Sequence, residues 1–437
     1  MLWFNGSNYC LPILLNNGGD IIKLYKYQQD IIKKLEPYNK VALYMECGTG
    51  KTFTSSVKAV RYKVPIIIVC PKAVLSQWIE HFNNVHTEYC TYNLTNKKQL
   101  QSFMDDKQDL KMGVITYGLV WRRSEMAKLK GFTLIVDESH NLCNPTSKQT
   151  KGVNKLKYDN LILLSGTPNG GAYEKLYTQM KMLGYKPNKK QFEDRYCNMF
   201  TMETAGIKFK VLSKKNPYKH IDELNQILRN DLHCVFLKTD DVHDLPEQHF
   251  IDIPIGVTKE YNKFLKWDYI DLGDREYIAG SPTDKLLYSR YLCGADNQNK
   301  IDVVTTLLDG IDDRVIIFYN FKIEQNVITK ICKKLKKPVF TCDGSIKEID
   351  KFKNTDKSVL LVQYQAGATG LNLQFCNKVI YFSPPLSSNL YEQSKARTWR
   401  CGQESTCNYW LLKCGIENDI YYSLDNKNDY TLKLFGG

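Results

Sequence analysis

The chain has 437 residues, more than one hydrophobic core usually contains, so its length predicts two domains. Its formal charge of +13 fits a polyanionic partner such as nucleic acid, although a solvated lysine-rich surface gives the same value. The 14 cysteines include no Cys-x-x-Cys pair, and no apolar run approaches the ~20 residues of a membrane span, so we expect neither structural zinc nor a membrane helix. Free thiols in a reducing cytoplasm are the simplest account of these cysteines.

Short apolar runs alternate with amphipathic stretches along both halves of the chain. Buried runs of this length between helices predict parallel sheets in a doubly wound α/β fold. We expect a first domain at 23–237 and a second at 255–437, joined by a polar linker at 238–254, after an unassigned extension at 1–22. Two stretches look inserted, a hairpin at about 200–216 and a partly helical segment at about 261–299. The predicted strands are 41–44, 65–70, 113–116, 133–136 and 161–164, then 314–319, 338–341, 358–362, 378–382 and 408–412.

A glycine-rich segment at 46–52 follows the first predicted strand and precedes a predicted helix, which is the context of a phosphate-binding loop. Gly48 and Gly50 let backbone N–H groups point at phosphate oxygens. Lys51 would neutralise the β- and γ-phosphates of ATP, and Thr52 would bind Mg²⁺. Alone, the same residues could form an ordinary glycine turn before a helix.

Two carboxylates end the strand at 133–136, at the sheet edge where α/β proteins bind ligands. Asp137 would hold Mg²⁺, and Glu138 would orient or deprotonate the attacking water. His140, with Ser165 and Thr167 after the next strand, would relay the nucleotide state to the rest of the protein. Isolated acids after a strand are often helix caps, but their order after Lys51 favours the catalytic interpretation.

The ordered set resembles superfamily-2 helicases, and most of all their Swi/Snf-type branch of double-stranded DNA translocases. The resemblance covers about 24–419 and implies two tandem RecA-like domains, each a parallel sheet flanked by helices, with an ATP cleft between them. It implies that Gln28 contacts the base of ATP. Met45, Ser139 and the segment 383–385 depart from the usual pattern of the branch. The segments that carry the resemblance, besides those above, are 24–28, 68–72, 77–78, 114–117, 316–320, 343–345 and 365–373.

An arginine-bearing helix pattern at 393–403 is the sharpest match to this branch. The resemblance implies that Arg397 and Arg400 are arginine fingers that complete the ATP site from the second domain, because a guanidinium fork stabilises a phosphoryl group in transit. Thr49, Gly370 and Gln393 join the implied nucleotide-binding set. A surface helix with solvated arginines is the alternative.

The resemblance also implies a DNA track across both domains. Hydroxyl, amide and lysine groups suit phosphate contacts without reading sequence. The three aromatic residues Trp78, Tyr117 and Trp121 either stack on bases or fill the core, and the core is the commoner place for them. The expected contacts are Lys72, Thr116, Ser345, Thr369 and Asn372.

These observations together predict an ATP-dependent DNA helicase or translocase that uses ATP and Mg²⁺ to remodel branched or duplex DNA in replication, recombination or repair. We expect a monomer that acts on duplex or branched DNA, and possibly on single strands, in a bacterial or phage-infected cytoplasm or a eukaryotic nucleus. An RNA-dependent helicase and an ATP-gated DNA clamp that never moves are the alternatives.

Overall fold

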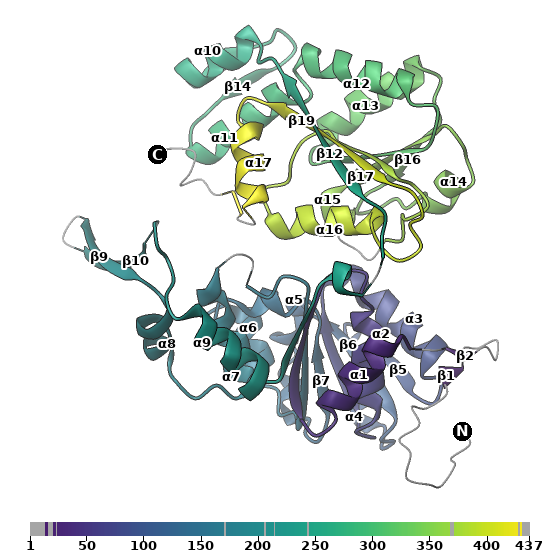
Figure 1. Ribbon diagram of the computed structural model, residues 1–437, viewed down its shortest axis with the longest axis vertical. Coiled ribbons are helices and arrows are strands. Elements are labelled where there is room, and N and C mark those ends of the chain that lie inside the picture. Colours follow the sequence, from purple (N-terminus) through teal and green to yellow (C-terminus); the bar gives the residue numbers. More distant parts are fainter. Residues whose placement is uncertain are drawn as a thin grey trace. The chain divides into compact units, whose positions relative to one another are not determined.

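The computed structural model describes residues 14–15, 21–22, 24–169, 172–204, 207–213, 215–242, 244–367, 371–426 and 429–430. The chain divides into two compact units, Met1–Val242 and His243–Gly437, which we call unit 1 and unit 2 (Figure 1). Each unit is built around its own parallel sheet. Most of the extension at 1–22 lies outside the described residues; the two short strands β1 (Leu14–Leu15) and β2 (Ile21–Ile22) pair antiparallel.

Unit 1 contains a seven-stranded sheet in the order β11-β3-β8-β7-β4-β6-β5, and all its neighbouring strands are parallel. Its strands are β3 (Lys40–Met45), β4 (Ile66–Cys70), β5 (Cys90–Asn93), β6 (Lys111–Thr116), β7 (Thr133–Val136), β8 (Asn160–Ser165) and β11 (Cys234–Leu237). Its helices are α1 (Lys26–Leu35), α2 (Lys51–Val60), α3 (Leu75–Val85), α4 (Lys97–Asp105), α5 (Tyr117–Val120), α6 (Lys148–Asn154), α7 (Tyr177–Leu183), α8 (Lys189–Tyr196) and α9 (Ile221–Gln226).

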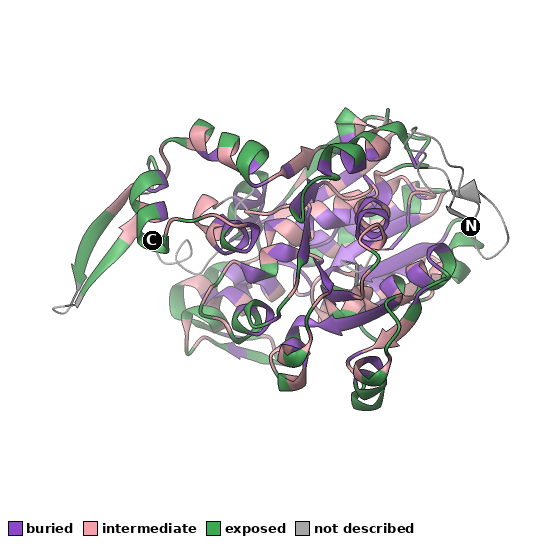
Figure 2. Cartoon of the chain, turned by 90° about the horizontal axis from the view of Figure 1, so that it is seen from below, coloured by how far each residue is buried: buried purple, intermediate pink, exposed green. Residues whose placement is uncertain are grey.

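Both faces of this sheet are covered, which explains why its strands are continuous apolar runs. Alternate residues of β3 enter different core clusters: Ala42 and Tyr44 pack on one side, and Val41 and Leu43 on the other. Successive side chains of a strand point to opposite faces, so a sheet buried on both sides has no polar alternation. Figure 2 shows the buried strands in the interior of the molecule.

Unit 2 contains a six-stranded parallel sheet in the order β12-β19-β18-β15-β17-β16. Its strands are β12 (Gln248–Ile255), β15 (Val315–Tyr319), β16 (Val339–Cys342), β17 (Val359–Gln363), β18 (Lys378–Tyr381) and β19 (Cys407–Cys414). Its helices are α10 (Lys259–Trp267), α11 (Pro282–Cys293), α12 (Gln298–Gly310), α13 (Lys322–Lys334), α14 (Ile349–Lys353), α15 (Tyr364–Gly367), α16 (Ser388–Thr398) and α17 (Glu417–Asp425).

Two small antiparallel hairpins stand apart from these sheets. The strands β9 (Met199–Thr204) and β10 (Ile207–Leu212) lie in the stretch 200–216, and β13 (Tyr269–Asp271) and β14 (Glu276–Ile278) lie in the stretch 261–299. The hairpin β9–β10 projects from the body of unit 1 (Figure 1).

The linker expected at 238–254 is wrong over its second half, because residues 248–254 belong to β12. This strand pairs with β19 at the edge of the unit 2 sheet, from Gln248 opposite Cys407 to Ile255 opposite Cys414. Most of its side chains are exposed, so it lacks the apolar run that marks the interior strands. Pro254 is tolerated there because an edge strand has one unpaired side.

Candidate nucleotide site

The chain segment that links β3 to α2 forms a tight loop around the amine of Lys51. Lys51 Nζ donates to the carbonyl oxygens of Met45 at 2.7 Å and Glu46 at 3.0 Å. Gly48 and Gly50 have φ angles of 88° and 75°, in the left-handed region that favours glycine. Gly50 ends this turn as the residue before α2, so the first N–H groups of the helix face the loop. The arrangement suits an anion, because it joins a helix N-terminus to a lysine.

Helix α1 packs directly against this loop through Tyr27 and through Gln28, the residue expected to contact the base. Gln28 is 4% exposed, and a Cβ atom on Gly50 would lie only 2.2 Å from its Nε2. Tyr27 donates its hydroxyl to the carbonyl of Thr49 at 3.0 Å. Gln28 and the phosphate loop are therefore neighbours, and a side chain at position 50 would be strained by the positive φ and would require Gln28 to move. Thr52 lies in the first turn of α2 and is half-buried.

The parallel register places the other candidate groups at the same edge of the sheet. Strand β8 lies between β3 and β7, and all three run in the same direction. The phosphate loop follows the carboxyl end of β3, and Asp137 and Glu138 follow that of β7. Ser165 is the last residue of β8, and Thr167 comes just after it. Within unit 1, the structure therefore brings together the lysine, the carboxylates and the relay residues that the sequence named.

Asp137 is held in place by two hydrogen bonds. Trp78 donates its indole N–H to Asp137 Oδ2 at 2.8 Å, and the Glu138 backbone N–H donates to Asp137 Oδ1 at 3.0 Å. Burial and, after it, the Glu138 charge raise the pKa of Asp137 to about 6, against the opposing effects of the Trp78 hydrogen bond and the Lys51 charge. Carboxylate oxygens are the kind of ligand that a divalent cation such as Mg²⁺ would take, and Asp137 would supply them here. The donor set thus fits Mg²⁺.

Glu138 adopts a strained backbone conformation directly beside this carboxylate. Its φ of 54° places a non-glycine residue in the left-handed region, and such outliers cluster at functional sites. Tyr117, which is buried, fixes the turn by donating its hydroxyl to the carbonyl oxygens of Asp137 at 2.7 Å and Glu138 at 3.2 Å. The sequence left Tyr117 open between base stacking and core packing, and the structure places it in the core.

His140 connects the carboxylate loop to the loop after β8. Its Nδ1 lies 3.3 Å from Glu138 Oε2 and 3.0 Å from Ser165 Oγ. Ser165 Oγ also accepts the backbone N–H of Thr167 at 3.2 Å. The three residues predicted as a relay are therefore joined by hydrogen bonds through Ser165, and the His140 ring lies beside the Glu138 carboxylate.

Gln179 in α7 is a member of this site that the sequence analysis missed. It is fully buried, and its Oε1 accepts hydrogen bonds from the hydroxyls of Ser139 at 2.7 Å and Tyr44 at 3.1 Å. Its Nε2 donates to the carbonyl of Pro168 at 2.8 Å. These contacts span up to 135 residues, so no local pattern marks Gln179; a glutamine on the buried side of a helix is the only signal.

Thr239, after β11, is a second contact that the sequence did not show. Its backbone N–H donates to Glu46 Oε2 at 3.0 Å, and its hydroxyl donates to the carbonyl of Cys47 at 3.2 Å. The end of unit 1 is thereby bonded to the phosphate loop.

In unit 2, the predicted arginine helix is shorter than its motif. Helix α16 ends at Thr398, so Arg397 lies on the helix and Arg400 lies beyond it, which corrects the expectation of one continuous helix. Trp399 has an extended backbone, and its indole N–H donates to the carbonyl of Pro246 at 2.7 Å, which turns the chain away from the helix axis. Gly402, with a φ of 93°, completes the turn.

Both arginines pack against the segment 371–373. Arg397 is buried and its carbonyl accepts the Leu373 N–H at 3.0 Å, while Arg400 donates to the carbonyl of Leu371 at 3.4 Å. Asn372 is exposed between these contacts. Gln393 is buried on the same helix, whereas Gly370 and Thr369 lie outside the described residues.

The remaining DNA candidates lie at the carboxyl ends of strands in their own units. Lys72 is exposed directly after β4, at the start of the short 3-10 helix η1 (Lys72–Val74), and Thr116 is buried at the end of β6. Ser345 is exposed in the turn after β16, and Asp343 Oδ1 accepts both its N–H and its hydroxyl.

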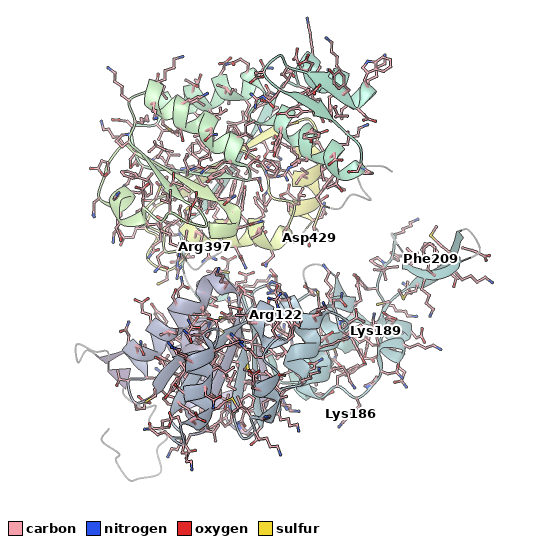
Figure 3. All side chains as sticks on the ribbon, turned by 180° about the vertical axis from the view of Figure 1, so that it is seen from behind. Arg122, Lys186, Lys189, Phe209, Arg397 and Asp429 are labelled. Carbon is pink, nitrogen blue, oxygen red and sulfur yellow. The ribbon has the colours of Figure 1, made fainter. Side chains whose placement is uncertain are left out.

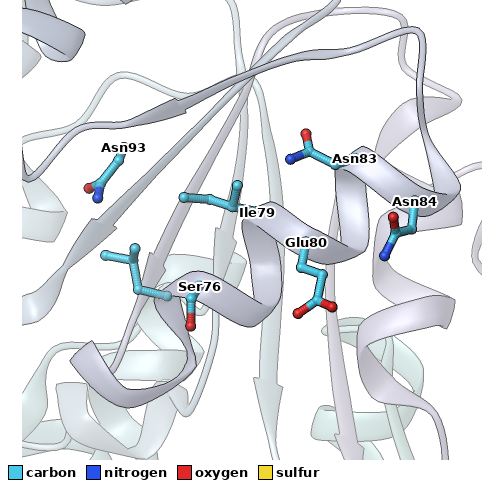
Figure 4. Close-up of a pocket in the computed structure, with 7 residues that line it drawn as sticks. Ser76, Ile79, Glu80, Asn83, Asn84 and Asn93 are labelled. Carbon is cyan, nitrogen blue, oxygen red and sulfur yellow. The ribbon is translucent and has the colours of Figure 1, made fainter.

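A surface hollow of about 460 Å³ lies between α3 and β5 (Figure 4). Its lining is Leu75, Ser76, Ile79, Glu80, Asn83, Asn84 and Asn93. None of these residues belongs to the predicted nucleotide set, so the hollow plays no part in that site.

Comparison with protein families shows the family to which the chain belongs. The chain matches the SNF2-related domain over residues 21–278 and the helicase conserved C-terminal domain over residues 299–402. It belongs to the SNF2-related family of helicases, which confirms the resemblance and the predicted tandem RecA-like α/β fold.

Individual relatives are distant. The putative ATP-dependent helicase/translocase YwqA of Bacillus subtilis (strain 168) is 23% identical over 87% of this chain and 45% of its own length. The DNA annealing helicase and endonuclease ZRANB3 of Mus musculus is 24% identical over 93% of this chain and 40% of its own length. The chain thus spans less than half of these two relatives. The Sulfolobus solfataricus SWI2/SNF2 ATPase core in complex with dsDNA is 20% identical, with a TM-score of 0.45 over 92% of this chain and 91% of that one.

Among the described residues, no helix is both long and apolar enough to cross a membrane.

Proposed function

We propose that the protein is a DNA-dependent ATPase that converts ATP hydrolysis into movement along DNA and so remodels branched or duplex DNA. One observation carries this proposal: three adjacent parallel strands present Lys51, the Asp137–Glu138 pair and the His140–Ser165 contact at one sheet edge. Membership in the SNF2-related family and the names of the relatives support the same activity.

In the proposed reaction, different residues of unit 1 have different roles. The phosphate loop and Lys51 bind the β- and γ-phosphates, while Gln28, packed against Gly50, reads the base. Thr52 and Asp137 hold Mg²⁺, which when bound neutralises phosphate charge. Glu138 orients the attacking water, and its contact with His140 reports the state of the γ-phosphate to the loop after β8.

Unit 2 supplies the groups that complete the reaction. Arg397 and Arg400 stabilise charge on the phosphoryl group when the two units close on ATP, and Gln393 and Gly370 belong to the same wall of the proposed cleft. Their anchorage on segment 371–373 ties these arginines to Asn372. We place Asn372 and Thr369 on the DNA track. Closure and reopening then shift the grip on DNA with each ATP hydrolysed.

The test is ATP hydrolysis measured with single-stranded, duplex, forked and four-way-junction DNA, and with RNA. We expect duplex or branched DNA to stimulate the rate and RNA to leave it unchanged. Lys51→Ala and Glu138→Gln should each lower the DNA-stimulated rate by at least about 10²-fold, because each removes a group that acts on the transferred phosphoryl or on water. Arg397→Ala should lower it about 10³-fold.

Two exposed residues of unit 1 provide matched controls. Lys33→Ala and Glu88→Gln make the same chemical changes at exposed positions outside the candidate site and should leave the rate unchanged. Indifference to every nucleic acid would reject the proposal, and stimulation by RNA alone would favour the RNA-dependent alternative. Displacement of a triplex-forming strand distinguishes a moving enzyme from an ATP-gated clamp.

A further inference from the structure

The hairpin β9–β10 is a free ribbon outside the parallel sheet of unit 1. Six cross-strand pairs join it, from Met199 opposite Leu212 to Thr204 opposite Ile207. Figures 1 and 2 show it projecting from the unit with mostly exposed residues. A two-stranded ribbon has no sheet to cover its faces, so its side chains are available to a partner.

One face of the hairpin is apolar and open to solvent. Residues directly opposite each other in an antiparallel pair share a face, so the pairs Phe200–Val211 and Met202–Phe209 lie on the same side. Phe200, Met202 and Phe209 are 47%, 42% and 43% exposed. Figure 3 places Phe209 on the hairpin, outside the body that carries Lys186 and Lys189. We call Phe200, Met202, Phe209 and Val211 the apolar face.

The surroundings of this face are basic. The stretch 199–219 contains five lysines and one acidic residue, Glu203. On the opposite face, Lys208 lies 3.8 Å from Glu203 and Lys210 lies 3.3 Å from Asp194, in exposed pairs that solvent screens. Lysines along open strands also oppose pairing with another protein strand. The excess positive charge therefore favours a polyanion over a protein as the partner.

The hairpin is firmly rooted in unit 1. Below its strands, Cys197 and Tyr218 form an antiparallel bridge, and the Asn198 N–H donates to the carbonyl of Pro217 at 2.8 Å. Cys197 is buried, and Tyr218 donates its hydroxyl to Glu174 Oε2 at 2.7 Å. These contacts fix the base of the hairpin, so that its orientation can be kept when a ligand binds to its strands.

The same root reaches the candidate nucleotide site through a short stretch of chain. Glu174 lies in the 3-10 helix η4 (Tyr173–Leu176), which runs directly into α7. Helix α7 carries Gln179, which is bonded to Ser139 and to the carbonyl of Pro168. A shift in the loops around Glu138 therefore has a continuous packed route to the base of the hairpin.

From these observations we infer that the hairpin β9–β10 places its apolar face against exposed bases at the junction of paired and unpaired DNA. Aromatic and methionine side chains stack on or insert between bases, whereas the lysines contact the flanking phosphates. The inference rests on the proposed DNA-dependent ATPase function and adds a strand-separating element to it.

The test is the double variant Phe200→Ser/Phe209→Ser, compared with the intact protein in two assays. Both residues are about half exposed, so the fold should survive. We expect ATP hydrolysis stimulated by blunt duplex DNA to stay within about twofold, and separation or regression of a forked DNA to fall at least about tenfold, because stacking on bases is lost. Trp267→Ser, which removes a 68% exposed aromatic residue from unit 2, is the control and should change neither rate.

A second measurement reads the contact directly. A photo-crosslinking phenylalanine analogue at position 209 should label the bases at the fork of the DNA and not its distant duplex arm. Unchanged fork processing by the double variant, or labelling confined to the arm, would overturn the inference. Loss of a self-associated state in the double variant without labelling of DNA would also overturn it, in favour of a second copy of the chain. Failure of the proposed function is distinguishable, because the intact protein would then show no stimulation by any DNA.

Discussion

At the scale of single residues, the amide of Gln179 joins three segments around the carboxylates. Replacing it by leucine would leave the hydroxyls of Ser139 and Tyr44 and the carbonyl of Pro168 without this buried partner. We expect Gln179→Leu to lower the free energy of unfolding of unit 1 by about 3 kcal/mol, because unsatisfied buried polar groups each cost about 1–3 kcal/mol.

Urea unfolding followed by circular dichroism measures this loss. The control is Gln101→Leu on α4, an exposed glutamine bonded to Asp105, which should change the value by less than about 0.5 kcal/mol. Equal midpoints for the two variants would contradict the role assigned to Gln179.

At the scale of elements, helix α3 carries His81 and is followed directly by His86, and burial keeps both histidines neutral. Burial lowers the pKa of His81 to about 4 and of His86 to about 3, from 6.5, and the two rings contact each other and Phe82. At a pH between 6.5 and these lowered pKa values, the two histidines bind more protons in the unfolded chain than in the folded one. The free energy of unfolding should therefore fall as the pH drops below 6.5, by about 1.4 kcal/mol per pH unit for each histidine.

Unfolding of the variant His86→Phe between pH 6.5 and 4.5 tests this dependence. We expect its free energy of unfolding to fall less steeply with decreasing pH than that of the unaltered protein, because it lacks the contribution of one histidine, about 1.4 kcal/mol per pH unit. His249→Phe, at an exposed position, should keep the original slope. A slope unchanged by His86→Phe would mean that this ring is already protonated in the folded protein.

Helices α12 and α17 are joined by a fully buried ion pair. Lys300 Nζ lies 2.6 Å from Glu417 Oε2 and also donates to the carbonyl of Phe382 at 2.8 Å. At pH 8 and above, Lys300→Met should destabilise unit 2 by about 3–5 kcal/mol, because it leaves an ionised, buried Glu417 carboxylate without its charge partner. The double variant Lys300→Met/Glu417→Leu should recover much of this loss.

The pH dependence of this pair gives an independent check. Burial raises the pKa of Glu417 to about 8, so the folded state takes up a proton more readily than the unfolded state, whose carboxyl titrates near 4.5. The cost of Lys300→Met should therefore be smaller at pH 5, where Glu417 is neutral, than at pH 8. Thermal unfolding at both pH values measures the difference, and an equal cost at both would contradict the assignment.

At the scale of the whole molecule, the division into two units separates the lysine and carboxylates from the arginines. Each unit has its own core, so we expect the fragment 1–242 to fold and bind ATP. It should hydrolyse ATP at less than about 1% of the DNA-stimulated rate of the intact chain, because Arg397 and Arg400 belong to unit 2. Calorimetry measures ATP binding by the fragment, and a phosphate-release assay measures its hydrolysis rate. Full activity of the fragment would show that the arginines are not needed for hydrolysis.

Much of this architecture was predictable from sequence because the interior strands are buried on both faces. Runs such as 133–136 therefore appear as apolar segments that end in polar residues, and the parallel arrangement places those polar residues together. The edge strands β5, β11 and β12 were missed because they lack that signature: β5 has no fully buried side chain, and β11 and β12 have only one each.

The contacts that orient the site were beyond the reach of local patterns. Trp78 and Asp137 are 59 residues apart, and Thr239 and Glu46 are 193 apart. The sequence offered Trp78 as a core or stacking residue, and it is both buried and a hydrogen-bond donor to the carboxylate. Directly after the end of α16, Trp399 is bonded to Pro246, which is 153 residues away along the chain. The roles of the individual site residues stay predictions.

The bonds from Thr239 to Glu46 and Cys47 have a mechanical consequence. The polypeptide departs for unit 2 only a few residues after Thr239, from a place already fastened to the loop around Lys51. A rearrangement of that loop around a bound triphosphate would therefore displace the chain segment that follows Thr239. In the proposed ATPase, the backbone alone would then couple nucleotide binding in unit 1 to unit 2.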